Sequence, residues 1–291
     1  MRLRAMAKIN LGLDVVGKRT DGYHEVKMVM QTIKMYDQLD IEMSQEAGIR
    51  METNLSFLPV NENNLVCKAA KLLMDEFDIR QGLDIRLKKV IPVAAGMAGG
   101  SADAAATMVG VNRIFRLGLS MQELMDRAVA IGADVPYCIM RGTALAEGIG
   151  EELTALPDAP QCYVLIGKPP ISVSTQFVYG NLKVDEISNH PDMDTLISAI
   201  KDNDFYKMAN NLGNVLEEVT IPHHPVIAQI KQEMLDNGAV GALMSGSGPT
   251  VFGLFDDKEK AIAARDFLRE SRLARQVFLT TFFSGGSKHG E

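Results

Sequence analysis

A segment of small residues in the first half of the chain limits most strongly how this sequence can fold. Residues 92–106 read PVAAGMAGGSADAAA, after a strand-like stretch at 82–90 and before a helical apolar repeat from Ala104 to Phe115. The pattern predicts a strand, a tight loop and a helix in direct succession. Small residues let a ligand approach the backbone closely, and the start of the helix would present unpaired N–H groups that favour phosphate. A flexible turn before a tightly packed helix is the second interpretation of the same residues.

Size and composition limit the class of protein. The chain has 291 residues, of which 46% are hydrophobic and 23% are charged, enough for one large or two modest domains. Its net charge of −7 disfavours a broad nucleic-acid surface. No window reaches the roughly 18 apolar residues of a membrane helix, and no apolar signal region follows the basic N-terminus. Three widely spaced cysteines, Cys67, Cys138 and Cys162, predict reduced thiols in a cytoplasmic protein.

The remaining patterns alternate between strand-like and helix-like stretches without strict strand–helix–strand repetition, which predicts an α+β fold. Ser120-Met121-Gln122-Glu123 forms a capping box that should begin a helix. A stretch rich in Pro and Ala, from Leu153 to Pro160, is predicted to connect two domains. Further strands are expected at 25–33, 39–43, 163–166 and 276–282, and further helices at 66–77, 226–235 and 258–269.

Two charged residues stand out because their neighbours are mostly apolar. Lys8 and Asn10, in AKINLGL, share one face of a predicted strand because strand side chains repeat every second residue. Asp134, in GADVPYC, lies just beyond a predicted helix end. A buried carboxylate beside a hydroxyl could act as a general base, and a lysine could stabilise an alkoxide or a transferring phosphoryl group. Without such a function, Asp134 would be a turn or cap residue and Lys8 a sheet-edge lysine.

Two turn sequences complete the candidate motifs. Residues 244–252 read MSGSGPTVF, a tight turn between apolar strands that either reverses the chain or forms an anion-binding nest of successive N–H groups. Residues 21–24 read DGYH and place an aromatic ring next to an imidazole. Such a pair can sandwich a flat base, although most turns of this composition are surface loops.

The order of these motifs along the chain resembles the GHMP kinase superfamily. The motifs extend from about Arg4 to Phe255 and read, in order, AKINLGL, DGYHE, PVAAGMAGGSADAAA, GADVPYC and MSGSGPTVFGLF. The DGYHE loop together with GADVP resembles the branch whose alcohol substrate carries a cytidine diphosphate. The family often reads GLGGGSS where this chain has Ala98 and Ala102, and a basic residue sometimes found beside an aromatic is replaced by Gly180.

The resemblance implies a two-domain α+β fold, a GHMP kinase fold. Residues 1–156 would form an ATP-binding domain like the second domain of ribosomal protein S5, and residues 157–291 a ferredoxin-like domain. The resemblance implies that Asp134 is the catalytic aspartate and Lys8 its partner, with ATP and Mg²⁺ as cofactors and no assigned metal ligand. The residues implied to bind ATP are Pro92, Val93, Ala94, Ala95, Gly96, Met97, Ala98, Gly99, Gly100 and Ser101.

The resemblance also implies the substrate contacts. Tyr23 and His24 would hold the cytosine ring, Tyr179 would cover that base, Thr175 would lie near the substrate phosphates, and Asn10 would touch the methylerythritol end. The implied reaction is ATP-dependent phosphorylation of the C2 hydroxyl of a diphosphocytidyl methylerythritol, in non-mevalonate isoprenoid precursor biosynthesis. The implied partners are ATP and this cytidine-diphosphate-linked small-molecule alcohol, without nucleic acid or membrane, for a monomer or a homodimer.

Two different functions stay open at this point. The chain could be another GHMP kinase that acts on a mevalonate-type or homoserine-type alcohol, although those families lack the DGYH loop. It could also be a non-catalytic binding or RNA-associated protein, because a fold by itself does not determine function. The net negative charge and the presence of both Lys8 and Asp134 argue against a non-catalytic or RNA-associated protein.

Overall fold

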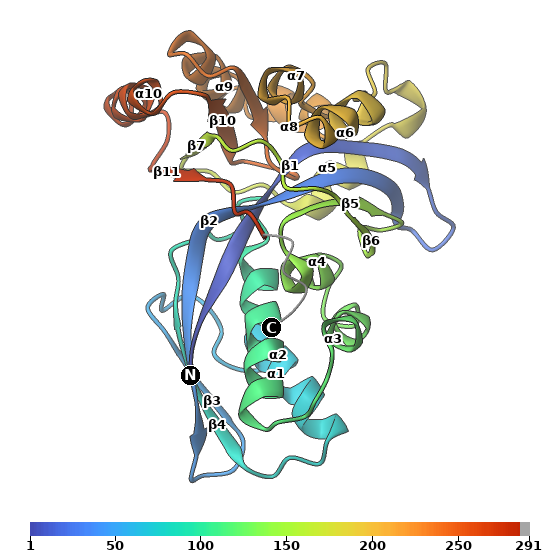
Figure 1. Ribbon diagram of the computed structural model, residues 1–291, viewed down its shortest axis with the longest axis vertical. Helices are drawn as coiled ribbons and strands as arrows, with labels where there is room; N and C mark the ends of the chain where they lie inside the picture. The colour runs from blue at the N-terminus through green and yellow to red at the C-terminus, as the bar shows by residue number, and fades with distance from the viewer. Residues whose placement is uncertain (286–291) are drawn as a thin grey trace. The chain divides into compact units, whose positions relative to one another are not determined.

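The structure, a computed structural model, describes residues 1–285 and contains two compact units (Figure 1). The units interleave along the chain, because the two long strands β1 (Arg2–Lys18) and β2 (His24–Ser44) each contribute a part to both of them. The first unit contains Met1–Ala7, Met35–Val93 and Ala98–Arg141, and the second contains Lys8–Lys34, Ala94–Met97 and the chain from Gly142 onward.

The first unit combines part of a larger sheet with four helices. Residues 38–44 of β2 pair antiparallel with β4, and β3 pairs parallel with β4. The helices α1 and α2 lie side by side in Figure 1, and the alanines that both helices bury allow them to pack closely. The elements are β3 (Ile49–Thr53), α1 (Leu65–Glu76), β4 (Gly82–Lys88), α2 (Gly99–Ile114), α3 (Met121–Ala128) and α4 (Asp134–Met140).

Local capping explains where two of these helices begin. The Asn64 side chain accepts a hydrogen bond from the N–H of Val66 at 2.9 Å at the start of α1. The Ser120 side chain accepts the N–H of Glu123, and the Glu123 carboxylate accepts the N–H of Ser120 at 2.8 Å. The second arrangement is the capping box that the sequence predicted.

The second unit contains a four-stranded antiparallel sheet in the order β11-β7-β10-β9. Helices α9 and α10 pack on this sheet. Gly167 in β7 permits that contact, because a Cβ there would lie 2.9 Å from Leu268 of α10 and 3.0 Å from Met234 of α9. The elements are β7 (Tyr163–Lys168), α9 (Val226–Asp236), β9 (Gly241–Met244), β10 (Val251–Phe255), α10 (Lys258–Ser271) and β11 (Gln276–Thr281).

The rest of the second unit is built around the parts of β1 and β2 that belong to it. Residues 28–31 of β2 pair antiparallel with β5, and β1 pairs parallel with β8 at Gly12 and Leu13. The remaining elements are β5 (Thr143–Glu147), β6 (Glu152–Ala155), α5 (Thr175–Asn181), the 3₁₀ turn Val184–Glu186, α6 (Met193–Lys201), α7 (Phe205–Asn210), β8 (Gly213–Asn214) and α8 (Glu217–His223).

The predicted mixture of strands and helices without regular alternation is confirmed. The strands predicted at 25–33 and 39–43 are two parts of the single strand β2. The stretch from Leu153 to Pro160 begins as strand β6 and lies within the second unit. In the described part of the chain, no helix is both long and apolar enough to span a membrane.

Candidate functional site

A buried lysine lies on the strand β1 of the second unit. Lys8 and Asn10 alternate onto the same face, as the sequence predicted, and are 5% and 0% exposed. The Lys8 Nζ donates a hydrogen bond to Asn10 Oδ1 at 2.7 Å, and the Asn10 Nδ2 lies 3.5 Å from the Met28 Sδ. No carboxylate among the described residues of this unit pairs with Lys8. Because a buried unpaired charge is costly, this face is suited to an anionic ligand.

The predicted phosphate loop enters the second unit at residues 94–97. The N–H of Lys8 donates to the Met97 carbonyl at 3.2 Å, which attaches the loop to β1. Gly96 has a φ of +71°, and a Cβ there would lie 2.0 Å from the Ser245 carbonyl oxygen. The Ser245 Oγ donates to the Gly96 carbonyl at 2.8 Å. Only glycine fits this position, because the backbone conformation and the close approach both exclude a side chain.

The turn at residues 245–249, called here the Ser245 loop, is held by a buried asparagine that the sequence analysis missed. The Asn214 Nδ2 donates to the carbonyl oxygens of Met244 and Gly246, both at 2.8 Å. The Ser247 Oγ lies 2.8 Å from the Thr175 Oγ1. The Ser245 loop is therefore a fixed structure that brings together hydroxyl groups from α5 and from the loop itself.

In the first unit, the same glycine-rich segment begins helix α2. Ala98 precedes the helix in the left-handed conformation, with φ 52° and ψ 31°, and no side chain caps the helix. The N–H groups of Gly99, Gly100 and Ser101 have no hydrogen-bond acceptor among residues 1–285. Three free donors at a helix start, where the helix dipole is positive, make this turn suitable for phosphate oxygens.

Three charged side chains are buried next to this turn, and none was predicted as a functional residue. The Lys89 Nζ donates to Asp103 Oδ2 at 2.7 Å and also contacts Asp37 Oδ2. Burial raises the pKa of Asp103 well above its usual range; the nearby Lys89 charge acts to lower it, and the Asp37 charge raises it further. Asp37 stands two residues before Leu39 and four before Ile41, so the three side chains share one face of β2. Leu39 and Ile41 are buried, and this spacing is the sequence signal that Asp37 is buried too.

Asp134 is the first residue of α4 in the first unit and is half-buried. Its carboxylate lies at the positive end of the helix dipole, a favourable place for negative charge. The described side chains of this unit provide it with no hydrogen-bond or ion-pair partner. A carboxylate in this position can accept a hydrogen bond or a proton from a ligand.

The predicted base-binding residues are partly brought together in the second unit. The rings of His24 and Tyr179 have centroids 5.2 Å apart and planes tilted by 47°. Burial lowers the pKa of His24, and the nearby Lys18 charge lowers it further, so the neutral imidazole is favoured. Tyr23 remains 60% exposed in the turn before β2. The structure therefore pairs His24 with Tyr179, while Tyr23 projects into solvent.

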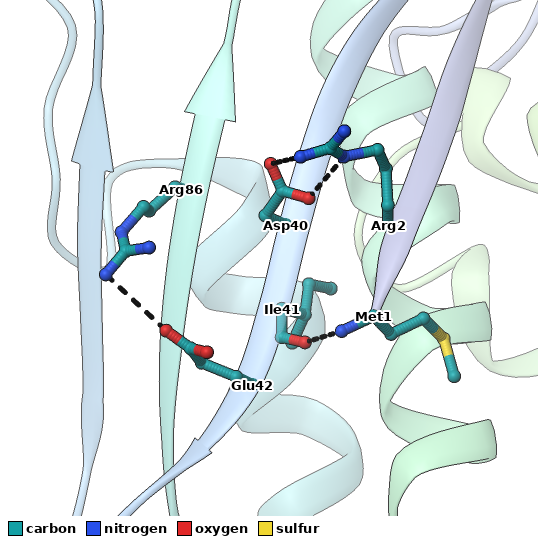
Figure 2. Close-up of a pocket in the computed structure, with 6 residues that line it drawn as sticks. All are labelled: Met1, Arg2, Asp40, Ile41, Glu42 and Arg86. Carbon is teal, nitrogen blue, oxygen red and sulfur yellow. Dashed lines mark hydrogen bonds and ion pairs between the residues drawn. The ribbon is translucent and has the colours of Figure 1, made fainter.

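A pocket in the first unit lies at none of the predicted residues. Figure 2 shows its lining, where the N-terminal amine of Met1 donates to the Ile41 carbonyl and the Arg2 guanidinium pairs with Asp40. An ion pair between Arg86 and Glu42 forms another part of the lining. The charged groups of this pocket already pair with one another, which leaves little unsatisfied charge for a ligand.

Comparison with known proteins identifies the family. A protein of Lachnospira eligens named 4-diphosphocytidyl-2-C-methyl-D-erythritol kinase is 56% identical over 98% of this chain and 99% of its own length. The model of the GHMP kinases N terminal domain matches residues 64–142, and that of the GHMP kinases C terminal domain matches residues 191–272. The chain belongs to the GHMP kinase family. The N-terminal match of this GHMP kinase covers the glycine-rich segment and Asp134.

Solved structures agree with this assignment. A crystal structure titled 4-(cytidine 5'-diphospho)-2C-methyl-D-erythritol kinase is 29% identical, covers 98% of this GHMP kinase and all of its own chain, and has a TM-score of 0.84. A homoserine kinase from Cytophaga hutchinsonii covers 95% of the chain and 93% of its own, with a TM-score of 0.72 and 20% identity, a likeness that shows the fold alone. The two-domain GHMP kinase fold expected from the motif order is confirmed.

Proposed function

We propose that this GHMP kinase transfers the γ-phosphoryl group of ATP to the C2 hydroxyl of 4-diphosphocytidyl-2-C-methyl-D-erythritol, a step of non-mevalonate isoprenoid precursor biosynthesis. The observation that carries the proposal is the 56% identity over nearly the whole chain to a protein named for this activity. Only likeness of fold supports the two alternative functions, a kinase for mevalonate-type or homoserine-type alcohols and a non-catalytic binding protein.

The residues from Pro92 to Ser101 are proposed to bind the phosphates of ATP. The free N–H groups of the first turn of α2 support this assignment, since they can donate to phosphate oxygens without moving. The left-handed conformation of Ala98 also supports it. An alanine there costs about 1–2 kcal/mol, a strain that is commonly found where a backbone is shaped for a ligand.

Asp134 and Lys8 are proposed to carry the chemistry. The Asp134 carboxylate would accept the proton of the C2 hydroxyl while that oxygen forms its bond to the γ-phosphorus and the bond to the β-phosphate oxygen breaks. The Lys8 ammonium would stabilise negative charge on the reacting oxygens, a role supported by its burial and its lack of a carboxylate partner within its unit. A positioned base of this kind contributes about 10²–10⁴-fold.

The residues of the second unit are proposed to bind the rest of the alcohol. Asn10 would contact the methylerythritol end, and the Thr175 hydroxyl, 2.8 Å from the Ser247 hydroxyl, would contact the substrate phosphates. His24 and Tyr179 would hold the cytosine, which is supported by the neighbouring positions of their rings. Tyr23 is exposed in this structure and would have to turn toward the base to contribute.

Mg²⁺ is proposed to enter with ATP. Residues 1–285 contain no group of three or more His, Cys, Asp or Glu side chains placed to hold a metal ion. This arrangement fits Mg²⁺ in kinases, which is bound mainly by phosphate oxygens and water with one or two protein oxygens. The Ser101 hydroxyl in the first turn of α2 is the oxygen of the glycine-rich segment available to hold it. The bound ion would neutralise charge that develops on the phosphates.

The division into domains at residues 156 and 157 remains a proposal, as does a cytoplasmic location. The location is supported by the three cysteine thiols, which are all buried. The proposed partners are ATP and the cytidyl alcohol, and the chain is proposed to act as a monomer or a homodimer.

The proposal is tested by ADP release from Mg·ATP with two alcohols, 4-diphosphocytidyl-2-C-methyl-D-erythritol and the same compound without its cytidyl group. Rapid release with the cytidyl compound only is expected, because the base would be held by His24 and Tyr179. Equal release with both compounds would contradict the proposed base site. No release with either compound, together with release when mevalonate or homoserine is added to the same assay, would contradict the proposed substrate.

A further inference from the structure

A cluster of three buried ionisable groups in the first unit has no part in the chemistry proposed above. The Lys89 side chain is 4% exposed, and those of Asp37 and Asp103 are 0% and 4% exposed. Burying three such groups is costly, and apolar residues of similar volume often give equal or greater stability. Stability alone is therefore a poor explanation of the cluster. A better explanation is that the cluster fixes the positions of the backbone segments that it joins.

The members of the cluster join three separate parts of the first unit. Asp37 lies on β2, and its Oδ1 accepts the N–H groups of Val90 and Ile91, the latter at 2.8 Å. The backbone of Lys89, just after β4, is held by the Asn54 side chain, which accepts its N–H at 2.7 Å and donates to its carbonyl at 3.1 Å. Lys89 thus has a fixed backbone, and its side chain reaches α2.

The contact with α2 is made at the glycine-rich segment. Asp103 is the fifth residue of α2 and receives the Lys89 hydrogen bond at 2.7 Å. A Cβ built on Gly99, the first residue of the helix, would lie 3.2 Å from the Lys89 Nζ and 3.0 Å from the Ile91 Cγ2. The backbone of the first turn, with its free N–H groups, therefore lies directly against the buried ammonium.

The charge of the cluster is also suited to a neighbouring anion. Asp103 Oδ1 has no hydrogen-bond partner among residues 1–285, and the residue is 3% exposed. Burial raises the pKa of Asp103, which favours the protonated carboxyl. The Lys89 ammonium and the raised pKa of Asp103 both reduce the negative charge behind the first turn of α2, where a triphosphate would bind.

We propose that Lys89 and Asp103 are positioning residues for ATP, since the hydrogen bond between them holds the N–H groups of the first turn of α2 where the phosphates bind. The inference rests on the proposed function, because its ligand is the ATP of that reaction. Neither side chain touches the phosphates in this role. They act through the backbone of α2, where misplacement by about 1 Å can cost up to about a hundredfold in rate.

The test compares two substitutions of Asp103. Asp103→Leu keeps the branched shape of the side chain, with methyl groups in place of the oxygens, but cannot accept the Lys89 hydrogen bond, and Lys89 keeps Asp37 as its counter-ion. Asp103→Asn keeps an oxygen that can accept that bond. The measurements are the dissociation constant of Mg·ATP by calorimetry, the KM of the cytidyl alcohol, the melting temperature, and amide hydrogen exchange over residues 99–103.

The expected result is a dissociation constant for Mg·ATP about tenfold higher in Asp103→Leu, with faster exchange at the start of α2 and an unchanged KM for the alcohol. The affinity of Asp103→Asn for Mg·ATP should lie within about twofold of that of the unsubstituted protein. A difference of this size is within the error of such comparisons. Lys88→Met serves as the control for loss of a nearby charge, because Lys88 is exposed and makes no hydrogen bond in this cluster.

Unchanged Mg·ATP affinity in a folded Asp103→Leu protein would overturn the proposal, even if its melting temperature falls. If that variant does not fold, the triple variant Lys89→Met/Asp37→Asn/Asp103→Asn makes the same test without leaving a buried charge unpaired, and wild-type affinity there would equally overturn the proposal. Failure of the proposed function is distinguishable, because the unsubstituted protein would then not release ADP with the cytidyl alcohol.

Discussion

The substitution Asn214→Ala is expected to release the Ser245 loop from β8. Asn214 makes three buried hydrogen bonds, two from its Nδ2 to Met244 and Gly246 at 2.8 Å and one to its Oδ1 from the N–H of Leu216 at 3.0 Å. Each bond contributes about 1 kcal/mol net, and a buried partner left unpaired costs about 1–3 kcal/mol. The free energy of unfolding should therefore fall by about 3–5 kcal/mol, a large part of the roughly 5–15 kcal/mol of a typical protein.

Urea unfolding monitored by circular dichroism measures the fall in the free energy of unfolding of Asn214→Ala. Asn214→Asp keeps the side-chain shape and the acceptor oxygen but places a carboxylate against two carbonyl oxygens. The free energy of unfolding should therefore fall at least as much as in Asn214→Ala. Asn211→Ala is the control, because it removes one exposed hydrogen bond, from Nδ2 to the Lys207 carbonyl at 2.7 Å, and should cost less than about 1 kcal/mol. If Asn214→Ala is no more destabilised than Asn211→Ala, the reasoning that Asn214 fixes the loop is refuted.

Three further predictions concern the proposed chemistry and the base site. Asp134→Asn and Lys8→Met should each lower kcat by at least about a hundredfold while the circular dichroism spectrum stays unchanged; near-normal kcat in either would contradict its role. Tyr179→Leu should raise the KM of the cytidyl alcohol several-fold, by roughly the 0.5–1.5 kcal/mol of an aromatic pair, and leave the KM of ATP unchanged. Lys18→Gln should raise the pKa of His24 measured by NMR titration, because the Lys18 charge now lowers it together with burial; an unchanged pKa would assign the shift to burial alone.

Features with local causes were predictable from the sequence. The capping box at Ser120 and the cap at Asn64 depend on residues within three positions, so the starts of α3 and α1 follow from the sequence alone. The common strand face of Lys8 and Asn10 follows from the period of two. The order of the motifs along the chain indicated the family, although no single motif was sufficient to identify it.

Features that depend on distant partners were not predictable. The buried cluster unites Lys89 with Asp37, 52 residues away, and with Asp103, 14 residues away. Asp37 also explains why β2 was predicted as two strands, because a carboxylate in the middle interrupted the apolar alternation. In the structure this carboxylate is buried and satisfied by Lys89 and by the Ile91 N–H, so the strand continues through it. A periodic pattern identifies buried positions, but it cannot show which distant residue will pair with a charged side chain at such a position.

The close approach of Gly96 to Ser245 limits when the glycine-rich segment can pack during synthesis of the chain. The two residues are 149 positions apart. At about 5–20 residues per second, Ser245 is synthesised roughly 7–30 s after Gly96. Throughout this interval the nascent glycine-rich segment lacks the carbonyl against which it packs. Gly96 and the residues next to it therefore take their final packed conformation only after Ser245 has been synthesised.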